Sequence, residues 1–287
     1  MIYKSACRCV QIASVFFFAV AASLLGACDA RDEAATDRRP VVVVSIPPQA
    51  FLIERIAGDR VDVKTLIVPG RSPEDFQPLP QQIAEIADAT YYFTIGLPFE
   101  EIWLPRLTET HPEIEIVAMH ATLEAGSGDP HNWTDPSQAI QLARTAFAPL
   151  EKMFPASAEV ISGNLHSLIE ELEILDSRIQ KLMDNQANRR FLVYHPAWSH
   201  FSDRYGLEQI AFERDGKQPG ARDLAELLAL CRTNEVQTVF VQPQSSSGHA
   251  QRFAHELGVR QEMIDPLHYY YVDNLWAVAE LIAGELW

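Results

Sequence analysis

The sequence is short of cysteine, of positive charge and of long apolar runs. It has 4 Cys among 287 residues, and 23 Lys and Arg stand against 39 Asp and Glu, which gives a formal net charge of -16. A surface this acidic repels phosphate backbones, and no basic stripe compensates, so we expect no nucleic-acid partner. With 47% hydrophobic residues the chain still has the composition of a globular protein, and its length favours two domains.

The start of the chain, 1–27, has the pattern of a signal peptide. Lys4 and Arg8 supply positive charge ahead of an apolar run over 10–25. That run has the length of a signal core rather than of a membrane span. We therefore expect an exported protein.

The tetrapeptide Leu-Gly-Ala-Cys at 25–28 resembles the bacterial lipobox, in which the chain is cut before the Cys and the Cys carries a lipid. Cys28 is thus the predicted lipid-attachment site, and 28–40 is a charged stretch without periodicity, typical of a flexible tether. An ordinary signal peptide cut at an Ala and an uncleaved anchor are the alternatives. Because Cys7 and Cys9 leave with the signal, only Cys231 remains in the folded body, and we expect no disulfide there.

Short apolar runs alternate with helical segments after the tether, and this alternation indicates a parallel α/β sheet. In the first half we expect strands at 41–46, 61–68 and 90–95 and helices at 49–57 and 81–88. The same order of elements returns in the second half, with strands at 191–194, 207–213 and 238–242 and helices up to Gly206 and over 221–233. A last helix is expected over 274–286. The repeat predicts two related lobes.

A long amphipathic stretch, 156–185, separates the two halves. Its apolar residues recur at intervals of three and four, which is typical of a helix with one buried face. Two helices broken near Gly163 are the alternative. The predicted fold is α/β, with parallel sheets in an N-terminal lobe (41–155) and a C-terminal lobe (188–287) joined by one helix (156–187).

Four residues that can bind a metal follow predicted strands, where open α/β sheets bind their ligands. Glu74 follows the second strand, His131 lies in the motif DPHNWTDP, His195 follows the strand 191–194, and Asp265 follows an apolar pair. Two imidazoles and two carboxylates suit a divalent first-row cation. The sequence thus predicts a four-residue metal site to which each lobe contributes two residues.

Several segments together resemble one family: VPGRSPEDFQPLP, IAEIADATYYFTIGLPFE, DPHNWTDP, VYHPAWSHFSDRYGL, VFVQPQ and IDPL. They are similar to the substrate-binding lipoproteins of zinc and manganese ABC uptake transporters, from about residue 41 to the C-terminus. The resemblance implies two lobes with one backbone helix and a metal in the interlobe cleft. It also implies delivery to a membrane permease with its cytoplasmic ATPase, by a lipid-anchored protein in the periplasm or at the cell surface. We expect a monomer.

Carried over to this sequence, the resemblance assigns metal binding to His131, His195 and Asp265. The first position departs from the family pattern, because Glu74 stands where a His is usual, and Asp75 is its rival. Zinc-specific members often carry a His-rich loop before the DPH motif, whereas the segment between His120 and His131 has no His.

Two nitrogen and two oxygen ligands suit Zn2+, and Mn2+ or Fe2+ remain alternatives if the coordination expands. The Irving–Williams order favours zinc over manganese at a given site. The sequence has no HExxH helix, no Gly-x-Ser-x-Gly elbow, no Walker loop and no dinucleotide fingerprint, so we do not expect an enzyme. The alternatives are a zinc-dependent hydrolase, with His200 as an extra ligand or base, and a surface adhesin, with 269–271 as a contact patch.

Overall fold

A computed structural model describes residues 38–123, 129–213, 217, 219–244 and 247–287. The predicted signal peptide, Cys28 and most of the tether lie outside these residues. Pro40–Trp287 form one compact unit. Among the described residues, no helix combines the length and the apolar character that a bilayer crossing needs.

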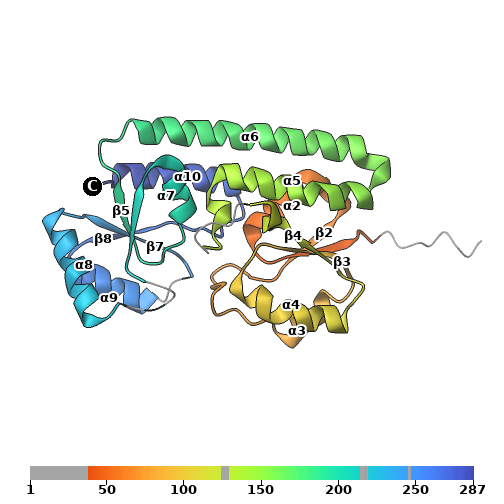
Figure 1. Cartoon of the computed structure of the whole chain (residues 1–287), viewed down its shortest axis with the longest axis horizontal. Coiled ribbons are helices and arrows are strands. Elements are labelled where there is room, and N and C mark those ends of the chain that lie inside the picture. Colours follow the sequence, from red (N-terminus) through yellow and green to blue (C-terminus); the bar gives the residue numbers. More distant parts are fainter. Residues whose placement is uncertain (1–37, 124–128, 214–216, 218, 245–246) are drawn as a thin grey trace, which may run out of the picture. The chain divides into compact units, whose positions relative to one another are not determined.

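Two parallel sheets of four strands organise this unit (Figure 1). The first sheet has the order β2-β1-β3-β4, with β1 Val41–Val44, β2 Asp62–Thr65, β3 Ala89–Thr94 and β4 Glu115–Ala118. The second has the order β6-β5-β7-β8, with β5 Arg190–Val193, β6 Glu208–Ala211, β7 Thr238–Val241 and β8 Arg260–Met263. The identical strand order confirms the repeated α/β unit.

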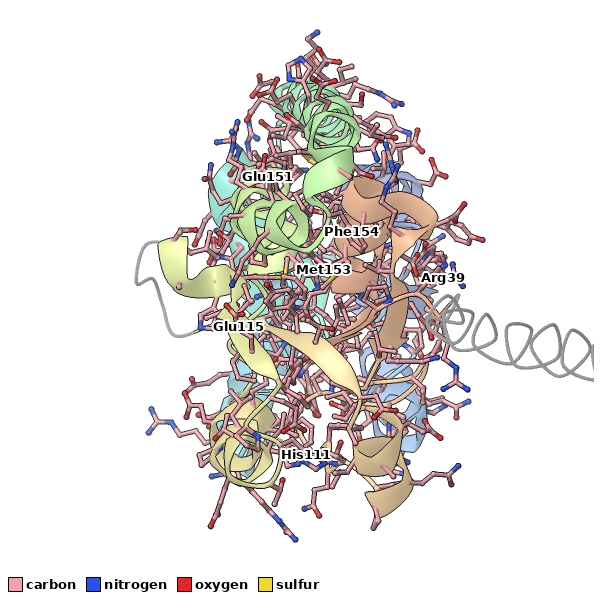
Figure 2. All side chains as sticks on the ribbon, turned by 90° about the vertical axis from the view of Figure 1, so that its right-hand side faces the viewer. Arg39, His111, Glu115, Glu151, Met153 and Phe154 are labelled. Carbon is pink, nitrogen blue, oxygen red and sulfur yellow. The ribbon has the colours of Figure 1, made fainter. Side chains whose placement is uncertain are left out.

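Helices cover both faces of each sheet (Figure 1). They are α2 Pro47–Ala57, α3 Pro80–Glu85, α4 Pro98–Thr110, α5 Pro136–Met153, α6 Ala158–Asp184, α7 Ser199–Tyr205, α8 Ala221–Thr233, α9 Ser247–Leu257 and α10 Tyr271–Gly284. Short 3-10 turns are η1 Gly58–Arg60, η2 Met119–Thr122, η3 Asn132–Thr134 and η4 Pro155–Ser157. Figure 2 shows the first sheet from the side, with Met153 and Phe154 on one side of it and His111, which follows α4, on the other.

Helix α6 runs over both sheets without a break, and α2, α5 and α10 pack against it (Figure 1). At 1.5 Å per residue it is about 40 Å long. Gly163 lies within its second turn without interrupting it, so the two-helix alternative is wrong. Burial of one apolar face outweighs the weak helix propensity of a single glycine. The buried residues of that face are Ile161, Leu168, Ile169, Leu172, Leu175, Ile179 and Met183.

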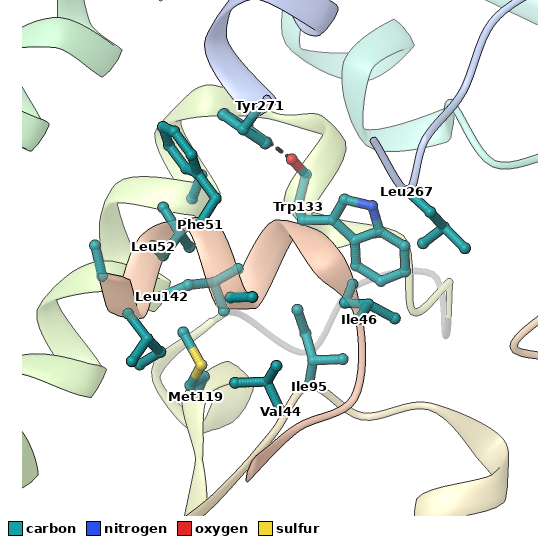
Figure 3. Packing of buried hydrophobic residues seen from close by; sticks show 14 of the residues in the cluster. Val44, Ile46, Phe51, Leu52, Ile95, Met119, Trp133, Leu142, Leu267 and Tyr271 are labelled. Carbon is teal, nitrogen blue, oxygen red and sulfur yellow. Dashed lines mark hydrogen bonds between the residues drawn. The ribbon is translucent and has the colours of Figure 1, made fainter. Parts of the chain in front are cut away.

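One apolar core extends from the first sheet under α6 to the inner face of the second sheet. Val43, Leu172 and Phe191 all belong to it, and Figure 3 shows a part of its first half. A smaller core lies on the outer face of the second sheet, where Leu192 and the free, buried Cys231 pack. Because side chains alternate along a strand, Phe191 and Leu192 enter different cores. The two lobes therefore share one continuous apolar core.

Some elements have no counterpart among those predicted from the sequence. Strands β4 and β8 lie at sheet edges and are only partly buried, so they lack the apolar runs that mark β1 and β7. Helices α4 and α5 each contain an internal proline, Pro105 and Pro149, which argues against a helix when only the sequence is read. Packing against the sheets and α6 stabilises them in spite of it.

Candidate metal centre

The structure brings three of the four predicted metal-binding residues to one small cavity. Glu74 comes from the loop after β2, His131 from the segment before η3, and His195 from the loop after β5. Asp265 follows β8 but does not line the cavity. The lining residues are Ser72, Pro73, Glu74, His131, His195, Gln242, Gln244, Pro266 and Leu267.

His195 lines this cavity and is almost fully buried. Its Nε2 lies 2.9 Å from Oε1 of Glu74, and its Nδ1 lies 3.1 Å from Oε2 of Glu213. Burial by itself lowers the pKa of His195, but the two carboxylates outweigh burial and raise the pKa to about 9. At neutral pH the ring is therefore protonated and donates from Nε2 to Glu74 and from Nδ1 to Glu213.

Glu74 shows the opposite shift. Burial tends to raise the pKa of its carboxyl, but the hydrogen bond and positive charge of His195, with a contribution from His131, bring the pKa below its usual value. Glu74 is thus ionised and joined to His195 across the two lobes. Both Glu74 and its neighbour Asp75 are exposed, but only Glu74 lines the cavity and bonds to His195, so the geometry favours Glu74 over its rival.

His131 is held by a carboxylate in the same way. Its Nδ1 lies 2.6 Å from Oδ1 of Asp129, and the same oxygen accepts a hydrogen bond from the His131 backbone N–H at 2.9 Å. Burial opposes ionisation of Asp129, but these bonds and the charge of His131 lower the pKa of Asp129 to about 2. The ring of Trp133 lies 5.2 Å away and forms an apolar wall beside the imidazole.

The two imidazoles face each other with 5.5 Å between ring centroids and an interplanar angle of 72°. Each has its Nδ1 bonded to a carboxylate, which leaves Nε2 as the nitrogen that can bind a metal. Among the described residues no three His, Cys, Asp or Glu side chains already stand in metal-site geometry. Glu74 and His195 are bonded to each other rather than aimed at a common point, so binding requires their hydrogen bond to open.

Asp265 is turned toward its own loop. Its Oδ1 accepts hydrogen bonds from Nε2 of Gln244 at 2.8 Å and from the backbone N–H of Leu267 at 2.9 Å. The structure therefore places Asp265 beside the cavity, behind Gln244, and not with the other three residues.

Buried hydrogen bonds fix the loops of the two lobes to each other beside the site. The indole Nε1 of Trp133 donates to the carbonyl of Pro266 at 2.7 Å, and the hydroxyl of Tyr271 donates to the carbonyl of Trp133 at 2.7 Å (Figure 3). His200 uses both ring nitrogens, with Nδ1 2.9 Å from the amide of Gln138 and Nε2 3.0 Å from the carbonyl of Asp129. These bonds make His200 a structural residue that secures the loop bearing His131.

Glu213 is a residue of the site that sequence reasoning did not find. It lies two residues after β6, at the same edge of the sheet as the residue that follows β5, so the strand-end rule that selected His195 could have selected it. A carboxylate on the far nitrogen of a metal-binding His fixes the ring orientation and makes the ring a stronger ligand.

We expect Glu213→Gln to weaken metal binding by about 10- to 100-fold, the range typical of such orienting carboxylates. Chelator-competition titration with Zn2+ measures the effect. Glu208→Gln is the matched control, because Glu208 lies on β6 but pairs with Arg190 at the surface. An unchanged affinity in Glu213→Gln would show that His195 does not depend on this carboxylate.

Comparison with known proteins identifies the family. The model of the family described as "Zinc-uptake complex component A periplasmic" matches residues 42–283, and the chain belongs to this family. A crystal structure of ZnuA superposes with a TM-score of 0.81 at 31% identity, covering 87% of this chain and 100% of that one. Family and fold thus confirm the resemblance and the two-lobed architecture.

Relatives of this chain are named for different metals. The chain is 26% identical over 277 residues to "Zinc-binding lipoprotein AdcA" of Streptococcus pneumoniae, covering 88% of this chain and 55% of that protein, so it spans about half of that relative's length. It is 23% identical over 256 residues to "Manganese-binding lipoprotein MntA" of Halalkalibacterium halodurans, covering 85% of each.

Proposed function

We propose that this protein captures a divalent transition metal outside the cytoplasm and delivers it to the membrane permease of an ABC uptake transporter, which works with a cytoplasmic ATPase. One observation carries the proposal. Two buried imidazoles from different lobes face each other with Glu74 in one cavity, and a carboxylate holds the Nδ1 of each ring. When the hydrogen bond between Glu74 and His195 opens, this arrangement would offer two Nε2 atoms and one carboxylate to a single cation.

We further propose Glu74, His131, His195 and Asp265 as the residues of the metal site, with Asp265 connected to the cavity through Gln244. Zn2+ is the favoured cargo, because imidazole nitrogens suit it and zinc exceeds manganese in intrinsic affinity. Mn2+ and Fe2+ are the alternative cargoes. The relatives named for zinc and for manganese agree with this choice of metals.

The lipid anchor belongs to the same proposal. Cleavage after residue 27 and lipidation of Cys28 would hold a monomer at the membrane, in the periplasm or at the cell surface, on the tether 28–40. The folded body would then consist of the lobes 41–155 and 188–287 and the connecting helix 156–187. Relatives whose names include "lipoprotein" support this arrangement.

We propose a binding role rather than catalysis. A catalytic zinc keeps one position for water or substrate, and a base must be able to reach that water. His200 was the candidate base, and the structure uses both of its ring nitrogens in hydrogen bonds.

The direct test is metal binding followed by transfer. The mature chain titrated with Zn2+, Mn2+ or Fe2+ should bind one ion per molecule at micromolar concentration or below. When it is added to vesicles that contain the permease and ATPase, it should support ATP-dependent metal uptake. A protein that binds none of the three ions would contradict the proposal, and so would tight binding without any uptake.

We expect Glu74→Ala to weaken Zn2+ binding by about 10-fold or more, yet by less than the loss of either histidine, because water can replace one carboxylate oxygen. Asp75→Ala should leave the affinity unchanged, since Asp75 does not line the cavity. Calorimetric titration of both variants measures the difference. The reverse order of effects would make Asp75 the ligand.

A further inference from the structure

Gln244 holds an unusual position at the candidate metal centre. It follows β7 and lines the cavity together with Glu74, His131 and His195. Its side-chain oxygen Oε1 is buried and has no hydrogen-bond partner within the described part of the chain. A buried acceptor without a donor is unfavourable, so its presence at a ligand cavity calls for a physical reason.

The orientation of the Gln244 amide follows from Asp265. The carboxylate oxygen Oδ1 of Asp265 only accepts hydrogen bonds, and it already accepts one from the backbone N–H of Leu267. The amide nitrogen of Gln244, 2.8 Å away, must therefore be the group that faces it. Flipping the amide would place two acceptors against each other. The amide oxygen is consequently fixed on the side away from Asp265.

A cation would satisfy this oxygen. The other polar side chains that line the cavity belong to Ser72, Glu74, His131, His195 and Gln242, and none of them donates a hydrogen bond to this oxygen. A metal ion, or a water bound to it, is attracted to acceptors and needs no proton from the protein. Carbonyl oxygens are established ligands of hard and intermediate divalent cations, including Mn2+.

We propose that Gln244 supplies an oxygen ligand to the metal through Oε1, and that Asp265 is a positioning residue that acts through Gln244. This inference rests on the proposed metal-binding function. The metal would then meet two imidazole nitrogens, one carboxylate and one neutral amide oxygen. Because the amide oxygen is uncharged and is a harder ligand than imidazole, it also makes the affinities of the site for Zn2+ and Mn2+ more similar.

The test compares Gln244→Leu with Asp265→Asn, with Co2+ as a spectroscopic probe. Asparagine at 265 keeps an oxygen that can accept from Gln244 and Leu267, so the positioning role survives. We expect Gln244→Leu to alter the visible Co2+ spectrum and to weaken Zn2+ binding by about 10- to 100-fold, and Asp265→Asn to do less. Gln261→Leu, an exposed residue of the neighbouring strand β8, is the control and should resemble wild type.

Two results would overturn the proposal: a wild-type spectrum and affinity in Gln244→Leu, or a larger loss in Asp265→Asn than in Gln244→Leu. A crystal structure of the zinc-loaded wild type tests the same point without any variant. We expect Oε1 of Gln244 at about 2.0–2.2 Å from the ion, the usual oxygen–zinc distance. An Oδ atom of Asp265 at that distance, with Gln244 displaced, would refute the inference. A wild type that binds no metal would refute the proposed function instead.

Discussion

Replacing His131 or His195 by alanine is expected to abolish tight metal binding. In the proposed site each ring contributes one of two nitrogen ligands, and each ring is buried, so water cannot restore an equivalent donor. The loss should exceed the 10- to 100-fold typical of an orienting partner, and it should be similar for the two residues because they are equivalent in geometry. Competition with a chelator of known zinc affinity measures it.

The matched control is His166→Ala. His166 is an exposed residue of α6 that pairs with Glu170 one turn along the helix, so its removal should leave the affinity unchanged. Thermal unfolding of the metal-free variants separates loss of a ligand from loss of the fold. Near-wild-type affinity in His131→Ala or His195→Ala would exclude that histidine from the site. Equal losses in all three variants would indicate a general rather than a local effect.

Metal affinity is expected to increase with pH up to about 9. The pKa of His195 is about 9 in the metal-free protein, because Glu213 and Glu74 stabilise its charged form more than burial destabilises it. Metal binding must remove that proton. Below pH 9 one proton therefore leaves with each ion bound, and the logarithm of the affinity should rise by about one per pH unit. Calorimetry in two buffers of different ionisation enthalpy counts the released proton.

The raised pKa of His195 has the opposite effect on the stability of the metal-free protein, which decreases as the pH rises. The folded pKa of His195 lies above the unfolded value of 6.5, so its contribution is fully present below about pH 6.5 and is lost as the pH rises through about 9. The pKa of Glu74 is lowered, so its contribution is present above its unfolded value of 4.5 and is lost as the pH falls through the folded pKa. Between these limits the Glu74–His195 pair stabilises the metal-free state most.

Melting temperatures with and without Zn2+ across this pH range check both signs. The metal-free value should fall between about pH 6.5 and 9, while the increase caused by zinc should grow. In Glu213→Gln one of the two carboxylates that raise the pKa of His195 is removed, so this pKa is lower. The metal affinity should therefore level off at a lower pH than in wild type. A metal affinity that does not change between pH 6 and 8 would mean that the ion does not displace the proton of His195.

Patterns within single segments predicted much of the fold. Helix α8 occupies 221–233, as its periodicity indicates, and α6 lies within the predicted stretch 156–185. The strands β1, β3, β5 and β7 lie inside or within one residue of the expected runs, because central strands of parallel sheets are apolar on both faces. The edge strands β4 and β8 are partly exposed and lack that mark, whereas the edge strands β2 and β6 lie within the expected runs 61–68 and 207–213.

The sequence predicted the candidate site through one rule, which places ligands at the carboxyl ends of the strands. Ligand-bearing loops at the carboxyl ends of strands led to Glu74, His131 and His195, and the structure brings these three together. The same rule led to Asp265, for which we propose a positioning role through Gln244 in place of the direct ligation that the sequence predicts. Glu213 follows β6, and Gln244 ends the segment VFVQPQ, but the sequence does not reveal their roles, because these arise from contacts with His195 and Asp265 on other strands.

The sequence by itself determined much of the secondary structure, the repeat of one α/β unit and the residue types available to a metal. Periodicity and composition are local properties, and they are legible along the chain. Only the tertiary structure decided which carboxylate orients each imidazole, that Glu74 rather than Asp75 meets His195, and that Gln244 stands between Asp265 and the cavity. Those outcomes depend on side-chain distances of about 3 Å between loops that are far apart in the sequence. The packing of both lobes against one continuous core sets these distances.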